Sequence, residues 1–139
     1  MPRNITEAEL QLFTRGYIEA AVFTESGGDN PVLPSRFDAI SVAHIDADCR
    51  AFVQANAEKM LEATDRIGYS WVRAGHDFWF SRNGHGVGYW DRRELEPDGL
   101  GDALWEACRH HEAYIYTAQG WTRYASTWPV SAAMLQHAA

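Results

Sequence analysis

The sequence is short of the features that mark several classes of protein. Its 139 residues include two cysteines, and no apolar run approaches the roughly 20 residues that a membrane-spanning helix requires. Cys49 and Cys108 fall at apolar positions of helical patterns, where cysteine commonly acts as a small buried side chain. We therefore expect neither a disulfide framework nor a membrane segment, and the polar first residues favour a cytosolic protein.

Positive charge is also scarce. Lys59 is the only lysine, and the formal net charge is −7. Binding to a phosphate backbone depends on clustered cations, so direct nucleic-acid binding is not expected. The acidic balance fits docking onto a basic protein surface, or it simply keeps the molecules apart by repulsion.

The length and the 46% hydrophobic content predict a single α+β domain over residues 1–139. A capping box over residues 6–9 predicts a first helix that runs to about Phe23. Residues 26–36, which hold Gly, Asp, Asn and two prolines, predict a loop. Apolar spacing then predicts a second helix over residues 40–65.

The second half of the chain predicts both helix and strand. Residues 69–74 are expected to form one helical turn capped by Ser70, and residues 100–110 a third helix. Residues 114–125 predict a hairpin with Gln119 and Gly120 at its turn. The Ala-rich residues 129–139 are expected to form a short helix or to stay mobile.

The densest signal is an aromatic segment over residues 75–91, between the second and third helices. Asn83-Gly84 suits a type I′ turn, and apolar residues flank it on both sides. This pattern predicts a β-hairpin, and hence a small antiparallel sheet of four strands with the helices packed on it. In this register His76 lies opposite Asp91.

The predicted hairpin argues against a metal site and against a phosphate-binding loop. His76 and His85 would lie about 20 Å apart along the ladder, so they cannot share one metal ion. Gly84, Gly86 and Gly88 lead into a strand rather than a helix N-terminus, which disfavours a phosphate-binding loop. We expect no metal and no cofactor.

Two further interpretations of the hairpin remain open. A carboxylate opposite His76 can orient the imidazole as a general base, with Asp77 or Asp91 as the acid, but it also satisfies an ordinary buried histidine. The sequence places no nucleophile beside them. The second interpretation is a binding surface near the turn, because the composition there is typical of hot spots; its residues are Trp79, Arg82, Asn83, His85 and Trp90.

The run AGHDFWFSRNGHGVGYWD, residues 74–91, resembles a signature of small acidic proteins encoded by bacteriophages and prophages. The resemblance extends over about residues 10–116, and the chain departs from the family after Tyr116. That family has no established activity, so the resemblance implies no catalytic residue. It implies a phage accessory protein that works in the bacterial cytoplasm.

These observations lead to three hypotheses. The first is a phage-type protein that binds and inhibits a host macromolecule with a basic surface, such as a CRISPR or restriction component. The second is a small hydrolase or transferase that uses His76 with Asp77 or Asp91, while Arg82 or Asn83 holds the substrate. The third is a structural protein that self-associates through Trp121 and Trp128. The oligomeric state does not follow from the sequence.

Overall fold

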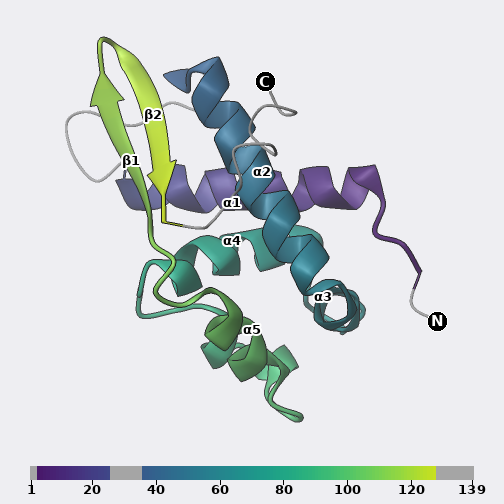
Figure 1. Cartoon of the computed structure of the whole chain (residues 1–139). Helices are drawn as coiled ribbons and strands as arrows, with labels where there is room; N and C mark the ends of the chain where they lie inside the picture. The colour runs from purple at the N-terminus through teal and green to yellow at the C-terminus, as the bar shows by residue number, and fades with distance from the viewer. Residues whose placement is uncertain (1–2, 26–35, 128–139) are drawn as a thin grey trace.

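A computed structural model describes residues 3–25 and 36–127, which form an α+β arrangement (Figure 1). This confirms the predicted fold class. The elements, in order, are α1 Glu7–Glu25, α2 Ala39–Ala55, α3 Ala57–Thr64, α4 Trp71–Arg82, two 3₁₀ turns η2 Tyr89–Asp91 and η3 Arg93–Leu95, α5 Leu100–Cys108, β1 Ala113–Ala118 and β2 Trp121–Ser126.

The first helix begins as the sequence predicts. Glu9 N–H donates to Thr6 Oγ1 at 3.1 Å, and Thr6 N–H donates to Glu9 Oε1 at 3.0 Å. These reciprocal bonds satisfy two backbone donors that the first turn of a helix leaves without partners. The capping box is therefore confirmed.

The predicted second helix is divided in two. Asn56 separates α2 from α3, and its side-chain Nδ2 donates to the carbonyl of Phe52 at 2.9 Å. An asparagine side chain competes in this way with the regular helical pattern. The apolar stripe continues across the break, which is why periodicity alone predicts one helix.

The largest correction concerns the predicted hairpin over residues 75–91. Residues 71–82 form the helix α4, capped by Ser70, whose Oγ accepts a hydrogen bond from Arg73 N–H at 3.1 Å. Its buried apolar positions follow helical spacing, at Trp71, Ala74, Gly75, Phe78 and Trp79, and Asp77, Ser81 and Arg82 are buried as well. The predicted cap at Ser70 is right, but the helix continues through Gly75 instead of ending there.

The Asn-Gly pair that suggested a hairpin turn ends this helix instead. Asn83 is the C-cap, and Gly84 follows in the left-handed region with φ of 70°. The His85 N–H donates to the Phe80 carbonyl at 3.1 Å, which is the outer hydrogen bond of a Schellman motif. A left-handed glycine suits both a type I′ turn and a helix C-terminus, so the dipeptide does not distinguish them.

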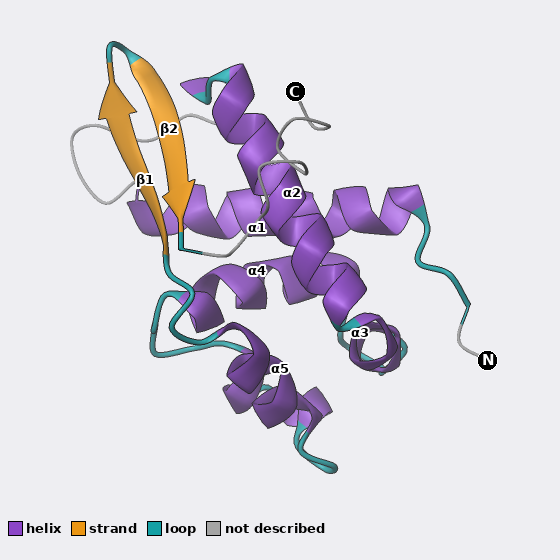
Figure 2. Cartoon of the chain, in the orientation of Figure 1, coloured by secondary structure: helices purple, strands orange, loops and turns teal. Residues whose placement is uncertain are grey.

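The hairpin at the C-terminal side is as predicted. Strands β1 and β2 pair in antiparallel register, with Ala118 opposite Trp121 around the two-residue turn. Both turn residues, Gln119 and Gly120, have positive φ, as a type I′ turn requires. In the part of the chain that the structure describes, the sheet has two strands rather than the four expected (Figure 2).

Helices α1 and α4 lie side by side in close contact along their length, and two glycines allow it (Figure 1). A Cβ at Gly75 would lie 2.0 Å from the Phe13 carbonyl oxygen, and one at Gly16 would lie 2.1 Å from the Val72 carbonyl oxygen. Around this contact lies the core, in which the Phe52 and Phe78 rings stack with centroids 4.2 Å apart. The hairpin and α5 lie at opposite ends of the molecule (Figure 1).

Trp128, one of the two tryptophans of the self-association hypothesis, lies outside the residues that the structure describes, and so do two predicted segments. They are the loop over residues 26–36, apart from its last residue, and the tail over residues 129–139. Among the described residues, no helix is long and apolar enough to cross a membrane.

The close α1–α4 contact can be tested with Gly75→Ala. The added methyl group meets backbone, which cannot rotate away, so we expect the free energy of unfolding to fall by about 1–3 kcal/mol. Gly86→Ala is the control, because nothing lies within 4 Å of its Cβ position, and its effect should stay within about 0.5 kcal/mol. Urea denaturation measures both, and equal stabilities would contradict the close contact.

Candidate functional site

The structure does not bring the predicted acid–base residues together. His76 lies on α4 and faces α1, where its Nε2 is 3.8 Å from Glu19 Oε2. Asp91 lies in η2, and its Oδ1 accepts a hydrogen bond from Gly88 N–H at 2.9 Å. The predicted opposition of His76 and Asp91 is therefore wrong, because it depended on strands that do not form.

Asp77 is buried and its carboxylate is fully engaged. Arg92 donates to it twice, from Nη2 to Oδ1 at 2.6 Å and from Nε to Oδ2 at 2.9 Å, and the Tyr69 hydroxyl donates to Oδ2 at 2.7 Å. The hydrogen bond to Asp77 raises the pKa of Arg92, while burial, together with the Asp77 charge, raises the pKa of Tyr69 well above its usual value. These contacts give Asp77 a structural role that links α4 to the segment after it.

Arg82, predicted to bind a partner or a substrate, lies in the core with its side chain fully buried. Its Nη1 lies 3.2 Å from Asp48 Oδ2 and donates to the hydroxyls of Tyr17 and Tyr124, each at 3.1 Å. Its Nε donates to the carbonyl of His111. A buried guanidinium held in this way cannot reach a ligand at the surface.

The two tyrosines that bond to Arg82 also bond to Asp48 or to each other. The Tyr124 hydroxyl donates to Asp48 Oδ2 at 2.6 Å, and the two tyrosine hydroxyls lie 2.7 Å apart. Burial raises the pKa of Tyr17 and of Tyr124 far above the ordinary value, so both stay neutral. We call Tyr17, Asp48, Arg82 and Tyr124 the buried arginine cluster; it joins α1, α2, α4 and β2.

The other predicted binding residues are divided between core and surface. Trp79 is buried, and its Nε1 donates to Thr24 Oγ1 at 2.9 Å. Asn83 is half-buried and bonds through Oδ1 to the N–H of Ala113, which ties the end of α4 to the start of β1. His85 and Trp90 are exposed. The five residues thus form no common surface.

One serine–histidine contact was missed by the sequence reasoning. Ser126 Oγ lies 3.1 Å from His44 Nε2, and the same nitrogen is 3.6 Å from Asp48 Oδ1. In a catalytic triad the serine and the carboxylate meet different ring nitrogens, so that the histidine can relay a proton between them. Here one nitrogen meets both groups, and the arrangement is that of a structural polar contact.

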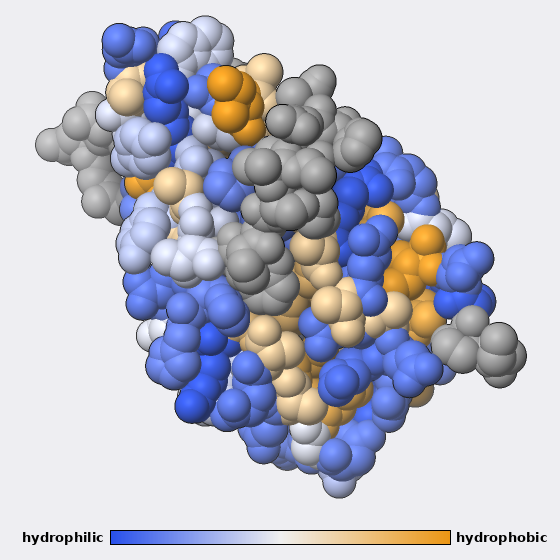
Figure 3. All heavy atoms as spheres, in the orientation of Figure 1, coloured by the Kyte–Doolittle hydropathy of each residue, from blue (hydrophilic) through white to orange (hydrophobic). Residues whose placement is uncertain are grey.

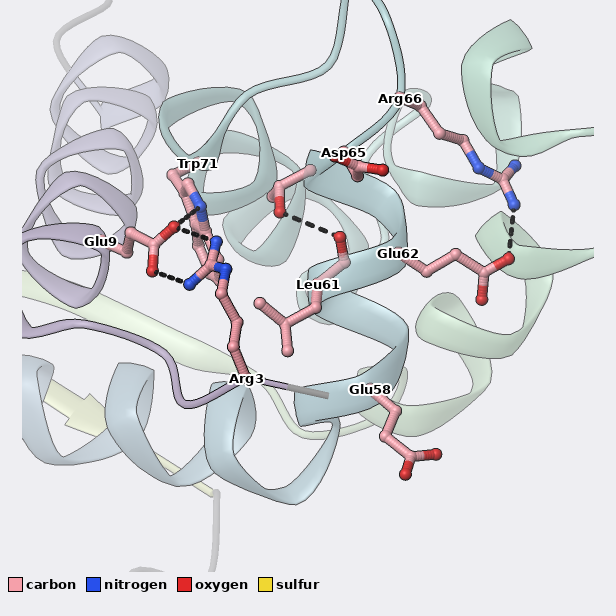
Figure 4. Close-up of a pocket in the computed structure, with 9 residues that line it drawn as sticks. Arg3, Glu9, Glu58, Leu61, Glu62, Asp65, Arg66 and Trp71 are labelled. Atoms are coloured by element: carbon pink, nitrogen blue, oxygen red, sulfur yellow. Dashed lines mark hydrogen bonds and ion pairs between the residues drawn. The ribbon is translucent and has the colours of Figure 1, made fainter. Parts of the chain in front are cut away.

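A groove of about 710 Å³ opens between the start of α1, α3 and the start of α4 (Figure 4). Arg3 makes a bidentate pair with Glu9, with bonds of 2.7 and 2.6 Å, and Trp71 Nε1 donates to Glu9 Oε2 at 3.0 Å. The hydrogen bond from Arg3 is the main reason that the pKa of Glu9 falls to about 2.

Much of the charge around this groove is paired within the protein. Arg66 reaches Glu62 at 2.9 Å and Asp98 at 2.6 Å, while Leu61 and Trp71 supply apolar surface. No group of three or more His, Cys, Asp or Glu residues in the described ranges could hold a metal ion. The groove can accept a side chain of mixed polarity.

The hairpin presents the clearest exposed aromatic surface. Tyr114, Tyr116 and Trp121 lie on one face of the two strands, with exposed fractions of 52%, 49% and 44%. The opposite face turns Thr122 and Tyr124 into the core. We call the first set the outward hairpin face. The alternation of large aromatics along β1 is the sequence signal that could have identified it.

No family model, no curated protein and no solved structure matches the chain. Function is therefore inferred from the residues and their geometry.

The role of Asp77 can be tested with Asp77→Asn. Removing the charge leaves Arg92 without its counter-ion in a partly buried place, so we expect a loss of about 3 kcal/mol in the free energy of unfolding. Asp91→Asn keeps an acceptor for Gly88 N–H and should cost less than about 1 kcal/mol. Chemical denaturation measures both, and an Asp77→Asn protein as stable as the wild type would refute the structural role.

Proposed function

We propose that this is a phage-type accessory protein that binds and inhibits a host macromolecule, in the manner of anti-CRISPR or anti-restriction proteins. The observation that carries the proposal is the outward hairpin face, with Tyr114, Tyr116 and Trp121 exposed side by side on a sheet. The phage setting is supported by the resemblance of residues 74–91, and it places the protein in the cytosol of the bacterial host.

Tyrosine and tryptophan suit this role because they offer large apolar area with a polar tip and few rotatable bonds. The face of the sheet opposite these aromatic residues is bonded to the rest of the fold. Tyr124 N–H donates to Ser41 Oγ at 3.0 Å, and the Tyr124 side chain enters the buried arginine cluster. A surface that is already ordered loses little conformational entropy when a partner binds.

The charge of the protein favours a basic partner. With a net charge of −7, it is attracted to positively charged surfaces, including clefts that normally hold nucleic acid. Glu112, just before β1, accepts a hydrogen bond from the Tyr114 hydroxyl at 2.7 Å, and Arg123, opposite Tyr116 on the same face, pairs with Asp38 at 3.3 Å, so charges of both signs border the aromatic residues. Figure 3 shows hydrophilic residues over much of one side of the molecule, with hydrophobic residues exposed between them.

The hydrolase or transferase alternative has less support. It requires His76, an aspartate and Arg82 around one pocket. Instead, His76 meets Glu19, Asp77 meets Arg92 and Tyr69, and Arg82 lies in the core. The notch beside His76 is lined by Glu19 and by the apolar side chains of Ala20, Phe23 and Phe80, so neither Asp77, Asp91 nor Arg82 contributes to its described lining.

The proposal can be tested in bacteria that carry a restriction or CRISPR system. Expression of the wild-type protein should raise the plating efficiency of a targeted phage, and the Tyr116→Ala/Trp121→Ala variant should lose most of this effect because its aromatic anchors are gone. The purified wild-type protein should bind the isolated defence complex, and the variant should bind it more weakly.

Ile67→Ala is the matched control, since Ile67 is 97% exposed and lies outside the hairpin. Circular dichroism must show that all three proteins are equally folded. The proposal fails if the wild-type protein neither binds nor protects across a panel of defence systems, or if the hairpin variant acts as well as the wild type.

A further inference from the structure

A second hollow adjoins the groove of Figure 4. It has a volume of about 480 Å³ and is lined, like the groove, by Arg3 and Glu58, so the Arg3 side chain lies where the two hollows meet. Ile5 and Leu10 add apolar surface to it. Pockets of about 300–1,000 Å³ hold a whole drug-sized molecule, so the two hollows have room for several residues of an extended peptide. We call the two hollows together the Glu9 groove.

The charged residues of the Glu9 groove are mostly acidic. Four carboxylates line it against two guanidinium groups, and these residues are Glu9, Glu58, Glu62 and Asp65 against Arg3 and Arg66. Arg66 is already shared between Glu62 and Asp98, at 2.9 and 2.6 Å. Within residues 3–25 and 36–127, no ion pair forms at Glu58 or Asp65. The groove therefore has an excess of negative charge, and a cation is its complementary ligand.

Arg3 shows how the groove holds a guanidinium group (Figure 4). Its Nη1 and Nη2 donate to Glu9 Oε1 and Oε2 at 2.7 and 2.6 Å, which is the bidentate geometry that suits an arginine and a carboxylate. Trp71 Nε1 donates to Oε2 at 3.0 Å, and Thr6 N–H donates to Oε1 at 3.0 Å. The Glu9 carboxylate is therefore held in position by groups other than Arg3.

The Arg3 side chain is the exposed member of this pair. It is 58% exposed, whereas the Glu9 side chain is 17% exposed, and it also donates to the neighbouring Asn4 carbonyl. Exposed ion pairs contribute little to stability, because water solvates both charges and a long side chain loses entropy when it is fixed. An arginine that arrives on a partner can therefore replace Arg3 at little cost, while the Glu9 carboxylate stays in place.

We propose that the Glu9 groove binds an arginine side chain from a basic segment of a partner protein, and that this arginine displaces Arg3 from Glu9. The new guanidinium group forms the bidentate pair with Glu9, and its methylene stem packs against Leu61 and Trp71. Basic residues on either side of it lie near the carboxylates that have no ion pair. Arg3 is then an internal competitor, which occupies the site until the partner arrives.

The chemistry of the groove favours arginine over lysine. A lysine ammonium is a point charge and cannot form the two parallel hydrogen bonds that Arg3 makes with Glu9. The guanidinium group is also more weakly hydrated than an ammonium, so it enters a site beside apolar Leu61 at lower cost. The negative lining repels a phosphate backbone, which disfavours a nucleic acid as the occupant.

The inference goes beyond the proposed function and does not depend on it. The Glu9 groove and the outward hairpin face share no residue, because the groove involves α1, α3 and α4 while the face belongs to β1 and β2. Loss of one surface leaves the other intact, so Tyr116→Ala/Trp121→Ala should not change binding at the groove.

Isothermal titration calorimetry with a short peptide that alternates arginine and alanine tests the inference. The wild-type protein should bind this peptide, bind its lysine version more weakly and fail to bind its citrulline version, because citrulline has the shape of arginine without the charge. The indole N–H NMR signal of Trp71 should shift on binding, because this group lies at the Glu9 carboxylate. Absence of binding, or equal binding of the arginine and citrulline peptides, overturns the inference.

Displacement of Arg3 is tested with variants of the pair. Arg3→Ala removes the internal competitor and should bind the arginine peptide about 2- to 6-fold more tightly than the wild type. Glu9→Gln keeps an acceptor for Thr6 N–H but loses the charge, so its affinity should fall at least about tenfold. Adding Arg3→Ala to Glu9→Gln should bring no further gain, because the competitor then has no site to occupy.

Glu106→Gln is the matched control, since it makes the same change of charge at an exposed residue outside the groove, and it should bind like the wild type. Circular dichroism checks that each variant is folded. Arg3→Ala that binds no more tightly than the wild type overturns the inference, and so does a folded Glu9→Gln that binds as well. If Glu9→Gln does not fold, Arg3→Ala and the citrulline peptide decide the outcome.

Discussion

The buried ion pair between Arg82 and Asp48 is the contact on which the arrangement of the elements depends. Both side chains are fully buried, and each is a charge that costs several kcal/mol to remove from water. Burial alone would lower the pKa of Arg82, yet Tyr17, Tyr124 and Asp48 raise it above the usual value. These three side chains and the carbonyl of His111 hold the guanidinium inside the core.

The partners of Arg82 come from segments far apart in the chain. Tyr17 lies on α1, Asp48 on α2 and Tyr124 on β2, while the His111 carbonyl lies just before β1. A two-stranded hairpin alone is marginally stable in water. Here the cluster fixes its inner face, so that the outer face can carry exposed aromatic side chains and remain ordered.

The inner face of the hairpin is buried and its outer face is exposed, so the proposed binding surface lies on the outer face. The segment with the densest signal in the sequence, residues 74–91, contributes mainly to the core and to caps, through Arg82, Asp77 and Gly84. The hairpin over residues 113–126, of which the sequence singled out only Trp121 as a contact residue, offers the exposed aromatic face. The candidate binding surface therefore lies at the end of the molecule farthest from α5.

Several elements could be predicted because local chemistry determines them. The capping box at Thr6 and Glu9, the cap at Ser70 and the turn at Gln119 and Gly120 act within a few residues of themselves. The failure over residues 75–91 has a physical cause, since Phe78, Trp79 and Arg82 fit a helix while the aromatic content and Asn83-Gly84 also fit a hairpin.

The missed features depend on contacts between distant segments. The close approach of Gly75 to α1 decides in favour of a helix only once α1 is in place, and sequence does not reveal that contact. The burial of Arg82 is likewise invisible in the sequence, because an arginine next to Asn-Gly is ordinarily a surface residue. Asp48 lies 34 positions away and gives no local sign that it is the partner.

A double-mutant cycle between Arg82 and Asp48 tests the central claim most directly. Arg82→Met and Asp48→Leu should each lower the free energy of unfolding by about 3–5 kcal/mol, because each leaves a buried charge without its partner. The double variant should lose at least about 2 kcal/mol less than the sum of the two. Arg15→Ala and Glu19→Ala, an exposed pair, should couple by less than about 1 kcal/mol. Additive losses at Arg82 and Asp48 would contradict the account.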